Sequence, residues 1–182
     1  MYQQRGDVVA VLERQHADVR DMFASLRSEP DAESFAVVVR LLTAHETAEE
    51  LVVYPVVRSD VPDGAALADA RLEEERAARQ QLAELESIGV GHPEFAELFG
   101  RFADDVLRHA TNEERQVFPL LRQELSEQRR FEMAAELEVA ESTAPTHAHR
   151  HAPTSAIGNR VVGPFVSIVD RLRDAFRARR AS

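Results

Sequence analysis

The chain has 182 residues, of which 44% are hydrophobic and 30% are charged, and its formal net charge is −10. This length allows one domain with a buried core and an appendage. The chain has no cysteine, which excludes disulfides, thiolate metal sites and cysteine nucleophiles. All 22 basic residues are arginine, which also excludes Schiff-base lysine chemistry.

The negative charge is concentrated before residue 142. Residues 1–141 carry 15 arginines against 30 acidic residues, whereas residues 142–182 carry 7 arginines against 2 acidic residues. An acidic main body argues against nucleic acid as a partner, because phosphate binding needs clustered basic charge. The first residues lack the pattern of a signal peptide, and no apolar run approaches membrane-spanning length. We therefore expect a cytoplasmic protein that does not bind membranes.

Helical periodicity runs through most of the chain and predicts an all-α fold. Four long helices are expected at residues 7–28, 31–58, 64–88 and 93–125, separated by clusters of Gly, Pro, Asp and Ser. Their short connections predict an up-down-up-down four-helix bundle. A short fifth helix is expected at residues 127–141 and would complete a domain of residues 1–141.

The last forty residues have a different composition. Residues 142–160 are rich in Pro, Ala and His without a helical period, which predicts a linker. Residues 161–182 have the pattern of an amphipathic helix. Such a helix can lie on a membrane surface, but packing on the bundle or on a second copy of the chain, as a homodimer, is the favoured interpretation. Its apolar face would consist of Phe165, Ile168, Val169, Leu172 and Phe176.

An eleven-residue pattern occurs twice. The segment HETAEELVVYP begins at His45 and HATNEERQVFP begins at His109. Each has a histidine with a glutamate four residues later, and this spacing places the two side chains next to each other on one helix face. His16 in the first helix and Glu75 in the third also fall on apolar stripes, so each helix directs metal-capable side chains inward.

A cation explains this combination better than an ordinary core does. A lone histidine on an apolar face is more often a hydrogen-bonded core residue than a ligand, and Glu75 alone would be read as solvated. Three carboxylates buried together without a counter-charge, however, would be very costly or would stay protonated. Three imidazoles and three carboxylates without sulfur suit iron, manganese or zinc. Six ligands exceed one tetrahedral zinc and suit two carboxylate-bridged ions.

Over about residues 7–125, these motifs resemble those of the hemerythrin-like, or HHE cation-binding, proteins. The resemblance implies a four-helix bundle around a non-heme di-iron centre with an oxo or hydroxo bridge. It further implies that two glutamates bridge the irons and that four residues are terminal ligands. By position, the bridging residues are Glu49 and Glu113, and the terminal ligands are His16, His45, Glu75 and His109.

The sequence departs from the oxygen-carrying hemerythrins, which supply five histidines and two carboxylates. Glu75 stands where the family pattern has a histidine, and the fifth histidine has no counterpart. An additional anionic ligand stabilises ferric over ferrous iron, which disfavours reversible O₂ carriage. We therefore predict hydrogen peroxide decomposition of a catalase or peroxidase type. The alternatives are an O₂- or NO-binding or iron-responsive sensor, a storage protein without turnover, and a purely structural bundle without metal.

Tyr54 is a further candidate for the site. It follows Glu49 by five residues, about 140° around an ideal helix, which points it away from the metals. Pro55, however, can kink the helix. Some hemerythrin-like proteins that decompose peroxide are similar in having a tyrosine just before this proline, near the iron. Tyr54 is therefore a candidate for binding iron or contacting a ligand, and the other interpretation is a packing aromatic, as Phe118 is in the second copy.

Overall fold

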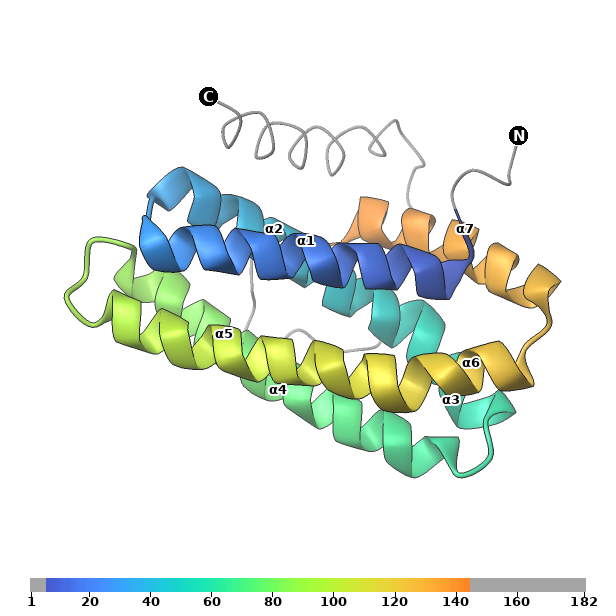
Figure 1. Cartoon of the computed structure of the whole chain (residues 1–182). Helices are drawn as coiled ribbons and strands as arrows, with labels where there is room; N and C mark the ends of the chain where they lie inside the picture. The colour runs from blue at the N-terminus through green and yellow to red at the C-terminus, as the bar shows by residue number, and fades with distance from the viewer. Residues whose placement is uncertain (1–5, 145–182) are drawn as a thin grey trace.

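The computed structural model describes residues 6–144, and within that range the chain is helical and has no strand (Figure 1). Four long rods alternate in direction, so the predicted all-α, up-down-up-down bundle is confirmed. The rods are α1 (Val8–Ser28); α2 (Ala32–Ala48), continued by the π-helical turn η1 (Glu49–Val53) and α3 (Tyr54–Asp60); α4 (Gly64–Ile88); and α5 (Phe95–Asn112), continued by the π-helical turn η2 (Glu113–Val117) and α6 (Phe118–Glu124).

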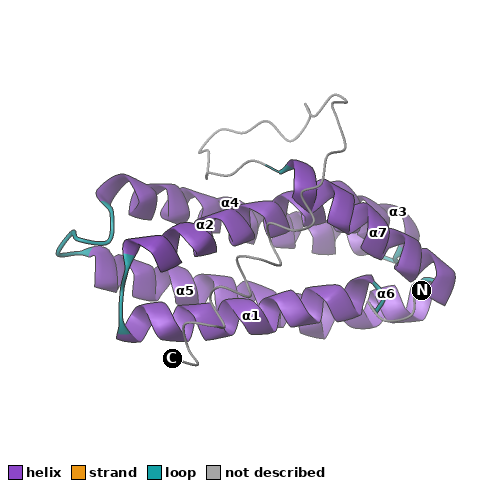
Figure 2. Ribbon diagram, turned by 90° about the horizontal axis from the view of Figure 1, so that it is seen from above, coloured by secondary structure: helices purple, strands orange, loops and turns teal. Residues whose placement is uncertain are grey.

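A fifth helix, α7 (Glu127–Thr143), lies outside the four rods and packs on α1, α2 and η1 (Figure 2). It ends at Thr143 rather than at the expected Glu141, just before Pro145, which disfavours helical geometry at the residue preceding it. The first two residues of the expected linker are therefore helical. The rest of that linker from residue 145, and the expected amphipathic helix at 161–182 with its dimer contact, lie outside the described residues.

Short polar side chains cap three of the helices, as the sequence pattern requires. The Asp7 carboxylate accepts from the Ala10 N–H at 3.1 Å, and the Asp31 carboxylate accepts from the Ser34 N–H at 2.8 Å. Ser126 caps α7 in the same way. Helix α5 starts at Phe95, two residues later than expected, because a turn in which His92 N–H donates to the Gly89 carbonyl precedes it.

The second and fourth rods are not regular helices throughout. Pro55 and Pro119 have no N–H to donate to the carbonyls four residues earlier, and the hydrogen bonding just before each proline shifts to an i to i+5 pattern. The N–H of Tyr54 thus donates to the carbonyl of Glu49, and the N–H of Phe118 donates to that of Glu113. Both copies of the repeated motif therefore contain a π-helical turn that begins at the motif glutamate.

Buried apolar side chains form two clusters at opposite ends of the bundle. One contains Leu12, Val53 and Leu121, and the other contains Phe23, Leu82 and Phe102. Along each rod, the candidate ligands lie between the part that enters one cluster and the part that enters the other. The polar residues thus form one layer across the middle of an apolar interior. In residues 6–144 no helix combines the length and apolar character that crossing a bilayer requires.

The connection into α4 depends on a glycine. A Cβ atom at Gly64 would lie 1.9 Å from the Val57 carbonyl oxygen. We therefore expect Gly64→Ala to lower the free energy of unfolding by about 1–3 kcal/mol, because the backbone of α3 must move. Urea denaturation followed by circular dichroism measures this. Gly100→Ala is the control, because its added Cβ would meet nothing within 4 Å beyond its chain neighbours and the backbone of its own helix. The higher helix propensity of Ala should leave stability equal or increased.

Candidate metal centre

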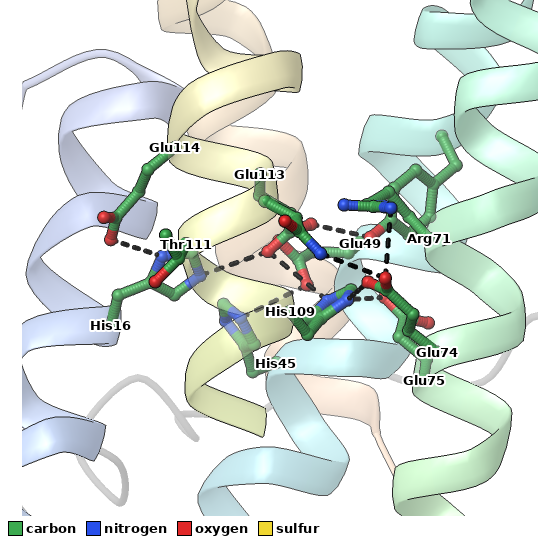
Figure 3. Close-up of polar contacts among 12 residues, drawn as sticks. His16, His45, Glu49, Arg71, Glu74, Glu75, His109, Thr111, Glu113 and Glu114 are labelled. Atoms are coloured by element: carbon green, nitrogen blue, oxygen red, sulfur yellow. Dashed lines mark hydrogen bonds and ion pairs between the residues drawn. The ribbon is translucent and has the colours of Figure 1, made fainter. Parts of the chain in front are cut away.

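The six residues predicted as metal ligands converge in the middle layer from all four rods (Figure 3). All six are buried, and the two motif glutamates are fully so. Their potential ligand atoms form two groups, within each of which all atoms lie within 4.8 Å of one another. The groups share Glu49 and Glu113. One group is His16, His45, Glu49 and Glu113, and the other is Glu49, Glu75, His109 and Glu113.

The three imidazoles present the same nitrogen to the carboxylates. His16 Nε2 lies 3.3 Å and His109 Nε2 lies 3.4 Å from Glu113 Oε2. His45 Nε2 lies 3.2 Å from Glu49 Oε2. Each imidazole therefore points one ring nitrogen into the layer, as a metal ligand must.

Several of these buried atoms have no hydrogen-bond partner. Both oxygens of Glu49 and both oxygens of Glu75 are unpartnered, as are Nε2 of His16 and of His109. Burial, together with the neighbouring carboxylates, raises the pKa of Glu49 and of Glu75 well above the ordinary value. Oxygen and nitrogen atoms left unpaired around a common centre fit a cation that accepts carboxylate and imidazole ligands.

For His45 and Glu113, the surroundings favour the protonation states that metal ligands need. Burial, reinforced by the neighbouring His16, lowers the pKa of His45 to about 3, so its ring is neutral at physiological pH. Burial would raise the pKa of Glu113, but the neighbouring imidazoles of His109 and His16 outweigh it and lower the pKa to about 2. Glu113 is therefore the carboxylate that stays charged even without metal.

The second ring nitrogen of each imidazole, Nδ1, contacts a polar side chain outside the two ligand groups. His16 Nδ1 lies 3.0 Å from Glu114 Oε1, and His109 Nδ1 lies 3.0 Å from Glu74 Oε2. His45 Nδ1 lies 2.8 Å from Gln15 Oε1. Such partners orient a metal-bound ring. The sequence analysis missed these three residues, although Glu74 and Glu114 each stand beside a candidate ligand in a Glu-Glu pair, which was the available signal.

Tyr54 lies at the centre rather than away from it. Its hydroxyl donates to Glu113 Oε1 at 2.6 Å, and its ring is buried. The expectation from ideal helix geometry is wrong, because the π-helical turn η1 places Tyr54 one full turn after Glu49 and returns it to the same side. In the second copy Phe118 stacks on the ring of His16, with centroids 5.5 Å apart.

A small, partly open cavity reaches the layer. All three imidazoles line it, together with Glu46, Glu75 and five apolar residues, which are Val19, Leu42, Ala78, Val106 and Ala110. Sequence analysis also missed Glu46, which is buried and lies 3.6 Å from the Arg79 guanidinium. Burial raises the pKa of Glu46 to about 7 despite the opposing charge of Arg79.

Fold and site together define a helical-bundle protein with a buried histidine and carboxylate cluster that could hold metal. The Hemerythrin HHE cation binding domain family matches residues 7–121, which contain all six candidate ligands. The chain belongs to this family, and the resemblance seen in its motifs is confirmed.

Two curated proteins illustrate the relationship. An uncharacterised hemerythrin-like protein of Schizosaccharomyces pombe is 28% identical over 134 residues, which are 73% of this chain and 66% of that protein. A DNA nickase of Nostoc is 31% identical over 136 residues, which are 72% of this chain and 38% of the nickase. The chain thus spans less than two thirds of either relative. No solved structure matches significantly.

Proposed function

We propose that the chain holds two iron ions in the middle layer and decomposes hydrogen peroxide. The observation that carries this proposal is the pair of four-residue groups that share Glu49 and Glu113. Two shared carboxylates favour two ions over one, since bridging carboxylates are typical of di-iron sites in helix bundles. His16 and His45 would serve one ion, and His109 and Glu75 the other.

Bound iron would supply the electron exchange with peroxide that protein side chains lack. The chain contributes access and proton handling. The apolar residues of the cavity admit a small neutral molecule more readily than an ion, because they offer an ion no compensating contact. Glu46 lines the cavity without belonging to either ligand group, so its carboxyl is placed to exchange protons with a molecule bound there.

The carboxylate content favours peroxide over oxygen carriage. Glu75 lies in the layer on the rod where oxygen carriers have a histidine, and its negative charge stabilises ferric iron. The nickase relative does not lead us to propose DNA cleavage, because residues 1–141 carry twice as many acidic residues as arginines. We keep the absence of a nucleic-acid partner as a prediction.

Metal content and peroxide turnover test the proposal together. Iron-loaded wild-type protein is expected to contain about two irons per chain and to release oxygen from hydrogen peroxide. His109→Ala should lower both the iron content and the rate, by roughly ten-fold or more in rate. His92→Ala is the matched control, since His92 is exposed in the loop before α5. Equal, background-level oxygen release from wild type and His109→Ala would exclude turnover, and a reversible O₂ or NO adduct of the reduced protein would then identify a sensor.

We further propose that the Tyr54 hydroxyl orients the Glu113 carboxylate, to which it donates, and would be available as a ligand to bound iron. Tyr54→Phe removes only the hydroxyl, and Phe118 shows that a phenylalanine fits the equivalent place. We expect the apo protein to lose about 1.5–3 kcal/mol of stability with the hydrogen bond to a charged group. If the phenolate binds iron, Tyr54→Phe also removes a visible charge-transfer band from the iron-loaded protein. An unchanged spectrum would assign Tyr54 the hydrogen-bonding role alone.

A further inference from the structure

The three side chains that contact Nδ1 of the imidazoles are not chemically equivalent. His16 and His109 meet the carboxylates of Glu114 and Glu74, and each carboxylate is itself paired with an arginine, Arg20 or Arg71. His45 instead meets an amide, that of Gln15. A carboxylate can only accept, so it fixes the proton on Nδ1 of its histidine. An amide has an oxygen that accepts and an NH₂ group that donates. Another contact of the Gln15 amide must therefore determine which of these two groups faces His45 Nδ1.

Glu141 of α7 determines the orientation of the Gln15 amide. Gln15 Nε2 donates to Glu141 Oε1 at 2.5 Å, and an ionised carboxylate accepts only the NH₂ end of the amide. The Gln15 oxygen is therefore directed at His45, whose Nδ1 must carry the proton. This leaves the lone pair of His45 on Nε2, which lies 3.2 Å from Glu49 Oε2.

This contact joins the centre to a part of the chain outside the four rods. The family match ends at residue 121, whereas α7 begins at Glu127. Helix α7 is anchored separately by the ion pair between Arg130 and Asp7, at 2.7 Å. A second small cavity lies between α1, α2 and α7 and is lined by Gln15, His45 and Glu141, among others. Glu141 is only partly buried, so a shorter side chain at residue 141 need not disturb the bundle.

We propose that Glu141 is a positioning residue of the metal centre, which acts through the Gln15 amide to fix the Nδ1-protonated tautomer of His45. Helix α7 would thereby contribute to the metal centre through Glu141, in addition to packing against the bundle. This inference rests on the proposed role of His45 as a metal ligand. The intervening amide separates the Glu141 charge from the imidazole, so its effect is on the tautomer and orientation of the ring.

The test compares Glu141→Ala with Glu136→Ala, which removes the same charge from an exposed site on the same helix. The tautomer of His45 is read by ¹⁵N NMR of the apo protein, and ferrous iron affinity is measured by competition with a chelator under anaerobic conditions. We expect Glu141→Ala to populate the Nε2-protonated form and to weaken iron binding by about 10-fold or more. Glu136→Ala should match wild type, and Glu141→Gln, which keeps an acceptor, should lose less than Glu141→Ala.

Gln15→Met provides a second variant and an internal check. It removes the amide while keeping the side-chain length, so it should weaken iron binding as Glu141→Ala does, and Glu141→Ala should add nothing in the Gln15→Met background. An unchanged His45 tautomer and unchanged iron affinity in Glu141→Ala would overturn the inference. Absence of iron binding by wild type would instead defeat the proposed function, and the apo-protein tautomer would still decide whether Glu141 acts on His45.

Discussion

Iron loading is expected to raise the free energy of unfolding by about 4 kcal/mol for each bound ion when free iron exceeds the dissociation constant of that ion a thousand-fold. The reason lies in the middle layer. The apo protein buries four carboxylate oxygens of Glu49 and Glu75 without hydrogen-bond partners, between two apolar clusters. A metal ion would give these oxygens partners only in the folded state, so binding and folding are coupled.

Urea unfolding followed by circular dichroism, with ferrous iron or with a chelator, measures this difference. Because burial raises the pKa of Glu49 and Glu75, the ions must displace protons that the apo site holds, and iron affinity should fall as the pH is lowered. His92→Ala should show the same iron-dependent stabilisation as wild type. Unfolding curves that coincide with and without iron would contradict the metal assignment.

Glu49→Leu is expected to change the apo and iron-treated proteins in opposite directions. Glu49 is fully buried and belongs to both candidate ligand groups. Leucine removes an unpartnered buried carboxyl, so the apo protein should gain about 1–3 kcal/mol of stability. The same change removes a ligand from both groups, so iron binding and the stabilisation by iron should both be lost.

Glu75→Leu is the informative comparison, because Glu75 belongs to one group only. Its apo protein should also be stabilised, but it should retain about one iron per chain, held by the group that contains His16 and His45. Metal analysis after desalting, together with urea unfolding, distinguishes the two variants. An iron content of two in Glu49→Leu would show that Glu49 is not a shared ligand. A destabilised apo form of Glu49→Leu would show that the Glu49 carboxyl has a partner in the apo state.

The two copies of the repeated motif have become chemically different halves of one site. Both contain a π-helical turn that begins at the motif glutamate, and both place an aromatic ring after it. In the first copy, the ring is Tyr54, which donates to the glutamate of the other copy, Glu113. In the second, it is Phe118, which stacks on His16 and offers no proton. Only the first of the two aromatic rings thus supplies a hydroxyl to the site.

The sequence by itself determined the helical class, the rods and the inward face of each rod. Helix α4 spans the predicted residues 64–88, and the six candidate ligands meet in one layer because each lies on an apolar stripe of period 3.6. The local period of apolar residues shows which face of a helix is buried. This was enough to predict that His16, Glu75 and the two His-Glu pairs would lie close together.

Tertiary structure alone decided the surroundings of those residues. His16 and Glu114 are 98 positions apart, and Gln15 and Glu141 are 126 apart, so their contacts depend on the rotation and offset of whole helices. A helical period carries no information on either quantity. Regular helix geometry gave the wrong direction for Tyr54 for a different reason, since the shift to i to i+5 hydrogen bonding before Pro55 changes which residues share a face. Pro55 in the sequence indicated only that the helix could depart from regular geometry there.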